Sequence, residues 1–294
     1  MFFQTEKYTK IKKIGIYVAI ILVSISILFG SFVISRNIII NIQKKKNETK
    51  NLLIYKEMGK ILPIHDIGKI KEYVTPIWKE DAAAKIKAIY SSDEKQVYLT
   101  FDDGPSSLTP SVLDILKEEN VCATFFVVGS RVDLYPDIVK RAYKEGHYIA
   151  NHGYTHSYST IYASEQAVLD EYTKCEQSIK NAIGNQEYNS YLFRFPGGSS
   201  GGRYHYLKNS AKVLLTSNNI ASTNWNCLTG DAEGIITPDG LVAKLNETQA
   251  HRTSLIVLMH DAADKQLTVD TLKQIIQNYK NQEYVFKNFY EIFK

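Results

Sequence analysis

The chain has few cysteines, and they are scattered. The three of them, Cys122, Cys175 and Cys227, are too few and too widely spaced for a disulfide framework or for a zinc site built on cysteine. Cys122 and Cys227 lie in apolar, strand-like stretches, where a buried thiol is the ordinary outcome. The sequence also lacks internal repeats and low-complexity tracts. We therefore expect the packing of one sizeable core to stabilise the fold.

Acidic and basic residues are divided unevenly along the chain. Residues 1–60 hold 11 Lys and Arg against 3 Asp and Glu, a net charge of +8, whereas the whole chain carries +4. The remaining 234 residues therefore carry −4. The N-terminal segment accounts for the basic isoelectric point of the chain. Because the remaining residues are net negative, we expect no nucleic-acid partner.

Charge is absent from residues 14–35, a run of 22 residues. As a helix this run would be roughly 33 Å long, enough to cross the core of a bilayer. Basic residues flank it on both sides, so the charge rule for orientation is ambiguous. A cleaved signal peptide is the alternative, but the length of the run and the lack of a small-residue cleavage site near Ser35 favour a retained anchor.

Two adjacent carboxylates follow a strand-like run. Residues 96–101 alternate and are rich in β-branched and aromatic side chains, and Gly104 and Pro105 then end the strand. A turn directly after Asp102 and Asp103 lets both carboxylates reach one cleft. The alternative is an Asp-rich turn that caps the next helix.

A pair of histidines, His152 and His156, follows another strand-like run at residues 147–150. Their spacing of four would place both rings on one face of a helical turn. Two unrelated surface histidines are the alternative. Together with a strand-end aspartate, however, two imidazoles suit a divalent metal that keeps an open position for water.

Five ordered motifs complete the pattern, and with them the sequence resembles the polysaccharide deacetylases of the nodulation-protein B type, carbohydrate esterase family 4. The resemblance covers roughly residues 93–294. The motifs are TFDDGP at 100–105, HGYTH at 152–156, RFPGG at 194–198, WNCLTGD at 225–231 and LIVLMH at 255–260.

The chain departs from the family pattern at four positions. Gly153 stands where a hydroxyl residue is commoner, and Gly197 where a tyrosine often follows the proline. In the fourth motif, Leu228 stands at the first acidic position and Ala232 where tryptophan is usual. The fourth motif is therefore the weakest match.

The resemblance assigns a metal site and a general base. It implies that Asp103, His152 and His156 hold one divalent metal, with zinc the best match and cobalt, nickel or manganese able to use the same ligands. Asp102 would be the general base, kept ionised by the guanidinium of Arg194.

The resemblance also assigns the groups that would stabilise the oxyanion and protonate the leaving group. The backbone amide of Gly197 would bind the tetrahedral oxyanion. His260 would be the general acid, with its ring held and its pKa raised by Asp231. The aromatic residues Trp225, Tyr154 and Tyr158 could line a sugar subsite, but aromatic side chains more often belong to the core, so we leave them out of the predicted site.

Strand-like and helical runs alternate between the motifs, which predicts a parallel α/β fold. Ligands bind beyond the carboxyl ends of the strands in such a barrel. Every motif falls at the carboxyl end of a predicted strand, so the predicted site and the predicted fold agree. With the family resemblance, we expect an irregular seven-stranded (β/α) barrel preceded by one transmembrane helix. The predicted strands are 96–101, 121–128, 147–151, 191–195, 220–226, 254–259 and 284–289, and the sequence also predicts helices at 110–117 and 136–145.

These observations predict a metal-dependent hydrolase that removes N-acetyl groups from amino-sugar polymers, most plausibly bacterial peptidoglycan. Because that substrate lies outside the cell, we expect a single-pass protein of the bacterial cell membrane with an extracellular catalytic domain. Two alternatives stay open: an O-deacetylase of xylan or an exopolysaccharide, and a barrel that only binds glycan. The predicted segments are a cytoplasmic N-terminus (1–13), an anchor (14–35), a stalk or small subdomain (36–92) and the catalytic domain (93–294).

Overall fold

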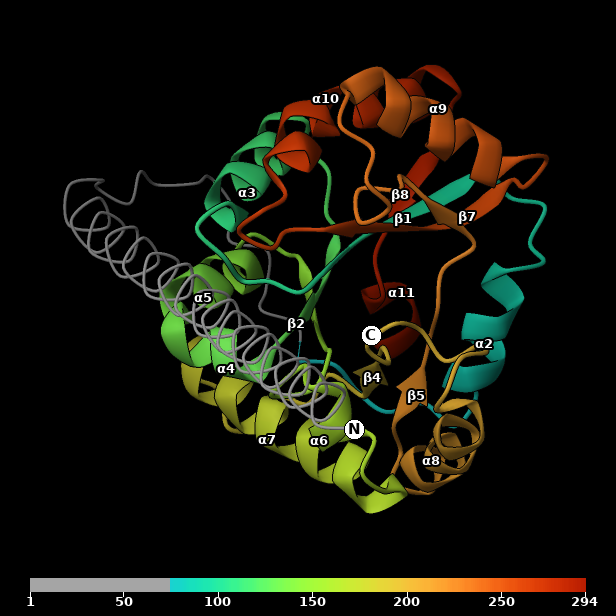
Figure 1. The fold of residues 1–294 in the computed structure, drawn as a ribbon. Helices are drawn as coiled ribbons and strands as arrows, with labels where there is room; N and C mark the ends of the chain where they lie inside the picture. Colours follow the sequence, from blue (N-terminus) through green and yellow to red (C-terminus); the bar gives the residue numbers. More distant parts are fainter. Residues whose placement is uncertain (1–74) are drawn as a thin grey trace, which may run out of the picture. The chain divides into compact units, whose positions relative to one another are not determined.

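A parallel β-sheet, curled and surrounded by helices, forms the part of the protein that the structure describes (Figure 1). The structure is a computed structural model, and it describes residues 75–294. Its strands are β1 (Gln96–Asp102), β2 (Thr124–Val127), β3 (Tyr148–Asn151), β4 (Leu192–Phe193), β5 (Ala221–Ser222), β6 (Cys227–Leu228), β7 (Ser254–His260) and β8 (Val285–Lys287). Its helices are α2 (Ala82–Ile89), α3 (Thr109–Glu118), α4 (Gly129–Leu134), α5 (Pro136–Lys144), α6 (Tyr158–Ile161), α7 (Glu165–Ile183), α8 (His205–Ser217), α9 (Pro238–Gln249), α10 (Gln266–Asn281) and α11 (Tyr290–Phe293).

The sheet runs in the order β5-β4-β3-β2-β1-β7-β6, and every pairing in it is parallel. Strand β7 pairs with β1 along its whole length, so β8 lies on the other edge of β1, beside residues 96–98, where β2 has not yet begun. Within residues 75–294 no pairing joins β5 to β6, so the barrel is open there.

The predicted strands correspond to observed strands, with one omission. The predicted strand at 220–226 runs over Asn224 and Asn226, which interrupt it, so the two-residue strand β6 was missed. Its pairing with β7 defines it instead. The predicted helices at 110–117 and 136–145 are α3 and α5, and α5 begins at a proline and stops before Gly146, whose φ is 86°.

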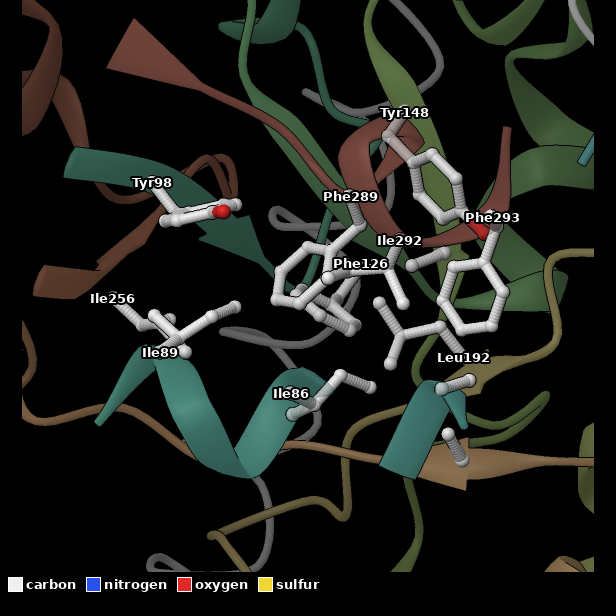
Figure 2. Close-up of a cluster of buried hydrophobic side chains, with 13 residues drawn as sticks. Ile86, Ile89, Tyr98, Phe126, Tyr148, Leu192, Ile256, Phe289, Ile292 and Phe293 are labelled. Carbon is white, nitrogen blue, oxygen red and sulfur yellow. The ribbon is translucent and has the colours of Figure 1, made fainter. Parts of the chain in front are cut away.

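Alternate strand residues point into the barrel. Their large side chains form a buried cluster at the amino ends of the strands, with Tyr98 from β1 and Ile256 from β7 (Figure 2). Helices α2 and α11 contribute Ile86 and Ile292 to the same cluster, so residues from both ends of the described chain close this end of the barrel. The opposite end of the barrel, where the carboxyl ends of the strands lie, holds the candidate active site described below.

The predicted membrane localisation requires correction. Among residues 75–294, no helix is both long and apolar enough to cross a bilayer. The longest helix there, α7, has 19 residues and carries charged side chains such as Glu165, Asp170 and Lys174 along its length. The predicted anchor at residues 14–35 lies outside the described residues.

Candidate active site

Strands β1 and β7 bring the first and fifth motifs side by side. Asp102 and His260 are paired in register at the carboxyl ends of these strands. Because side chains alternate, they share the inner face with Tyr98 and Ile256 of the buried cluster, four residues earlier on each strand. Packing at the amino ends of the strands therefore determines that Asp102 and His260 point into the barrel at the carboxyl ends.

Arg194 holds Asp102 from behind. It follows β4 directly and is 0% exposed, and its Nη1 donates to Asp102 Oδ1 at 2.8 Å and to Thr100 Oγ1 at 2.7 Å. Its guanidinium carbon also lies 3.9 Å from the centre of the Phe126 ring. The charge of the arginine is thus paired inside the barrel, and one oxygen of Asp102 is committed to it.

His152 and His156 come together through a loop, so the predicted helical turn is wrong. Residues 152–156 are not helical; Gly153 and His156 have φ values of 83° and 55°, which a right-handed helix does not allow. The two rings nevertheless lie 5.1 Å apart, centre to centre.

A carboxylate on α7 explains this loop conformation. Oε2 of Glu171 accepts the N–H groups of Tyr154 and Thr155 at 2.8 and 2.7 Å. Two backbone donors that a helix would have used are thereby satisfied by a side chain. Sequence reasoning missed Glu171 because nothing local marks a helical glutamate as a partner of a loop.

The side chains of Asp103, His152 and His156 fit a metal ion. One ligand atom from each lies within 4.8 Å of the others. Nδ1 of His152 is 2.7 Å from the Arg194 carbonyl oxygen, which can only accept, so the proton is on Nδ1 and Nε2 carries the lone pair. That lone pair faces Oδ1 of Asp103 at 3.4 Å.

The electrostatics of Asp103 agree with this fit. Its Oδ1 is buried and has no hydrogen-bond partner within residues 75–294. Burial acts to raise the pKa of Asp103, whereas positive charge on His152 and His156 outweighs burial and holds this pKa well below its usual value. When the two imidazoles are neutral, a bound cation would have to supply that positive charge. An ionised oxygen facing an imidazole lone pair is an arrangement that a cation would stabilise.

Asp231 holds His260 in a fixed orientation. Its two carboxylate oxygens accept from Nδ1 of His260 at 2.8 Å and from the His260 backbone N–H at 2.7 Å. Thr268, on α10, donates to Asp231 as well, at 2.8 Å. Burial acts to lower the pKa of His260, but Asp231 outweighs it and raises this pKa to about 9.

A cavity of about 300 Å³ unites these groups. Arg194 does not line this cavity; it is buried and contacts Asp102 from the protein interior. Seven of the eight site residues predicted from the sequence line the cavity: Asp102, Asp103, His152, His156, Gly197, Asp231 and His260.

Two aromatic residues that we left out of the predicted site also line the cavity, namely Tyr158 and Trp225. A Cβ atom built on Gly197 would lie 2.2 Å from the Tyr158 hydroxyl, so this tyrosine occupies the space beside the glycine. Its proximity to His156 in sequence was the one available signal. Tyr154 is not in the lining; its hydroxyl donates to Asp133 at 2.9 Å.

Comparison with known proteins identifies the family of this chain. A family model described as polysaccharide deacetylase matches residues 90–215. A peptidoglycan-N-acetylglucosamine deacetylase of Bacillus cereus is 31% identical over 204 residues, covering 68% of this chain and 71% of that protein. The chain belongs to the polysaccharide deacetylase family.

Solved structures of polysaccharide deacetylases share the fold. A CE4 esterase of Streptococcus mutans superposes with a TM-score of 0.64 at 31% identity, over 72% of this chain and 92% of that one. The catalytic domain of a peptidoglycan N-acetylglucosamine deacetylase from Eubacterium rectale gives 0.61 at 34% identity, over 66% and 88%. The enzyme class is therefore that of a polysaccharide deacetylase, a hydrolase.

Proposed function

We propose that this polysaccharide deacetylase removes N-acetyl groups from amino sugars of bacterial peptidoglycan. The observation that carries the proposal is the convergence, in one cavity, of a carboxylate fixed by Arg194 and an imidazole fixed by Asp231. Deacetylation of an amide needs a base for the attacking water and an acid for the departing amine. The names of the relatives from Bacillus cereus and Eubacterium rectale support the choice of polymer.

Asp102 is the general base in this proposal. Arg194 holds Oδ1, which leaves Oδ2 as the oxygen that accepts the proton of the attacking water. Oδ2 lies 3.7 Å from Nε2 of His152, so the base is adjacent to the proposed metal ligands. A carboxylate in this position can act on a water held between it and the acetyl carbon.

His260 is the general acid. With its pKa near 9, the ring is protonated at neutral pH and can donate from Nε2, since Nδ1 is committed to Asp231. Protonation of the amine makes it a leaving group, which an amide needs more than an ester does. The fixed Asp231 prevents the ring from turning its proton away from the cavity.

Asp103, His152 and His156 are the residues that would hold a divalent metal, with zinc as the proposed ion. The chemistry that such an ion supplies is a lowered pKa of a bound water and a polarised acetyl carbonyl. The N–H of Gly197, which lines the cavity, would donate to the oxyanion of the tetrahedral intermediate.

Acetate release tests the proposal. The zinc-loaded full chain would be assayed on N-acetylglucosamine oligomers, peptidoglycan fragments and acetylated xylan, with Asp102→Asn as the blank. We expect release from the amino-sugar substrates and none from the blank, which should still bind zinc. Release from xylan alone would replace the proposal with an O-deacetylase. No release from any substrate by zinc-loaded protein would favour a barrel that only binds glycan.

A further inference from the structure

The peptide unit between Pro196 and Gly197 lies in a tight turn at the cavity wall. The N–H of Gly198 donates to the carbonyl of Phe195 at 2.7 Å, which closes a four-residue turn. Proline at its second position and a glycine with φ of 71° at its third are the marks of a type II turn. Among the common turn types that allow proline at the second position, only type II has a left-handed residue at the third, so Gly197 determines how the central peptide faces.

The carbonyl of this peptide unit is held in the protein interior. The hydroxyl of Tyr162 donates to the Pro196 oxygen at 2.6 Å. Nζ of Lys208 lies 3.4 Å from the same oxygen and 2.6 Å from the carbonyl of Gly198. Both side chains are buried, at 3% and 5% exposure, so water competes little for these bonds.

The N–H on the other side of the same peptide is free. Within residues 75–294 the one cis peptide bond is Gly104–Pro105, so the Pro196–Gly197 bond is trans and its N–H points opposite to its carbonyl. The N–H of Gly197 donates to no acceptor in the described part of the chain. Gly197 itself lines the cavity.

We propose that Tyr162 and Lys208 are positioning residues, which orient and polarise the Pro196–Gly197 peptide so that its N–H becomes a strong donor toward the oxyanion. The inference rests on the proposed function of Gly197. A hydrogen bond to a carbonyl oxygen withdraws electron density from the whole amide and strengthens its N–H as a donor. The ammonium group of Lys208, fixed by the two carbonyls, adds positive potential behind that donor.

Isotope labelling can observe this one peptide directly. Pro196–Gly197 is the only Pro-Gly pair in the sequence, so protein labelled with carbonyl-13C proline and 15N glycine gives a single carbonyl-to-amide correlation peak. In the zinc-loaded full chain, Tyr162→Phe should move both the carbonyl carbon and the amide proton upfield. Lys208→Met should move them in the same direction. An unmoved peak in Tyr162→Phe would overturn the proposal.

A matched control separates this effect from general loosening of the core. Tyr172 is as buried as Tyr162, in the same hydrophobic cluster, but its hydroxyl donates to Asn189. Tyr172→Phe should leave the correlation peak in place. If it moves the peak as far as Tyr162→Phe does, the shift reports packing and the proposal fails.

Kinetics then connect the peptide with turnover. Removing a whole oxyanion donor costs about 10²- to 10³-fold in kcat, so weakening one should cost roughly 3- to 30-fold, with KM nearly unchanged. Tyr172→Phe should keep its kcat. If Tyr162→Phe shifts the peak but keeps the wild-type kcat, Tyr162 has no role in turnover. The role of the Gly197 N–H in the proposed function would then be overturned as well. Absence of deacetylase activity in the wild type would instead refute the proposed function, while the peak shift would still test the polarised peptide.

Discussion

Replacing Asp231 by asparagine should move the alkaline limit of activity. Nδ1 of His260 donates to Asp231 at 2.8 Å, and this contact, with smaller contributions from the charges of Asp102 and Asp103, raises the pKa of His260 from 6.5 to about 9. Burial acts in the opposite direction and persists in Asp231→Asn. The pKa of His260 should therefore fall to about 6.5 or lower in the variant.

The size of the shift gives a quantitative expectation. A change of about 2.5 in the pKa corresponds to roughly 3.4 kcal/mol of net interaction between the imidazolium and its surroundings, of which Asp231 supplies the largest favourable part. At about pH 8 the wild-type ring is roughly nine-tenths protonated, whereas a ring with a pKa near 6.5 is about 3% protonated. If His260 is the general acid, this difference alone lowers kcat/KM about 30-fold.

The assay is kcat/KM for acetate release against pH, with the pKa of His260 followed by NMR in parallel and its signal assigned by comparison with His260→Gln. The wild type should lose activity as the pH rises through about 9, and Asp231→Asn through about 6.5. An alkaline limit at the same pH in both proteins would refute the role of His260 as the acid that Asp231 tunes. Thr268→Val, which removes only the outer hydrogen bond to Asp231, should shift the limit much less.

The same pair predicts a pH window for stability. The pKa of His260 is raised in the folded protein, so its contribution is complete below about pH 6.5 and is lost as the pH rises through about 9. For Asp231, burial acts to raise the pKa, but His260 outweighs it and lowers it, so this contribution is lost as the pH falls below about 4. The difference in unfolding free energy between wild type and Asp231→Asn should therefore be largest between these limits.

Three further predictions concern the other buried groups. Arg194→Met should lower the unfolding free energy by about 3–5 kcal/mol in denaturant titrations, because Asp102 is left buried without its partner; a loss below about 1 kcal/mol would contradict the pairing. His152→Ala should abolish tight zinc binding in calorimetry while the fold persists, and wild-type affinity in this variant would exclude the proposed ligand set. Burial raises the pKa of Asp261 to about 7, against a hydrogen bond from Thr109, so the folded protein retains a proton there that the unfolded chain releases near pH 4. Metal-free wild type should thus lose stability as the pH rises from about 4 to about 7, and Asp261→Asn should lose less; parallel profiles would show that Asp261 is not the titrating group.

The sequence by itself determined the strands other than β6, the approximate positions of their carboxyl ends and the residues that follow them. The alternation in β1 and the continuous apolar run of β7 are local properties, and the turn residues after Asp103 mark where β1 ends. In a parallel barrel all such ends meet on one side, so strand positions alone are enough to predict that Asp102, Asp103 and His260 lie together.

Only the tertiary structure decided the conformation and environment of the groups between those strands. The loop that carries His152 takes its shape from Glu171, and the tautomer of His152 is set by the carbonyl of Arg194. The carbonyl of the Pro196–Gly197 peptide likewise has its partners, Tyr162 and Lys208, on elements distant in the chain. These contacts join elements that are separate in the chain, and the strength of each bond depends on burial. Spacing and residue type cannot specify such contacts, because only packing brings distant donors and acceptors together and excludes water from them.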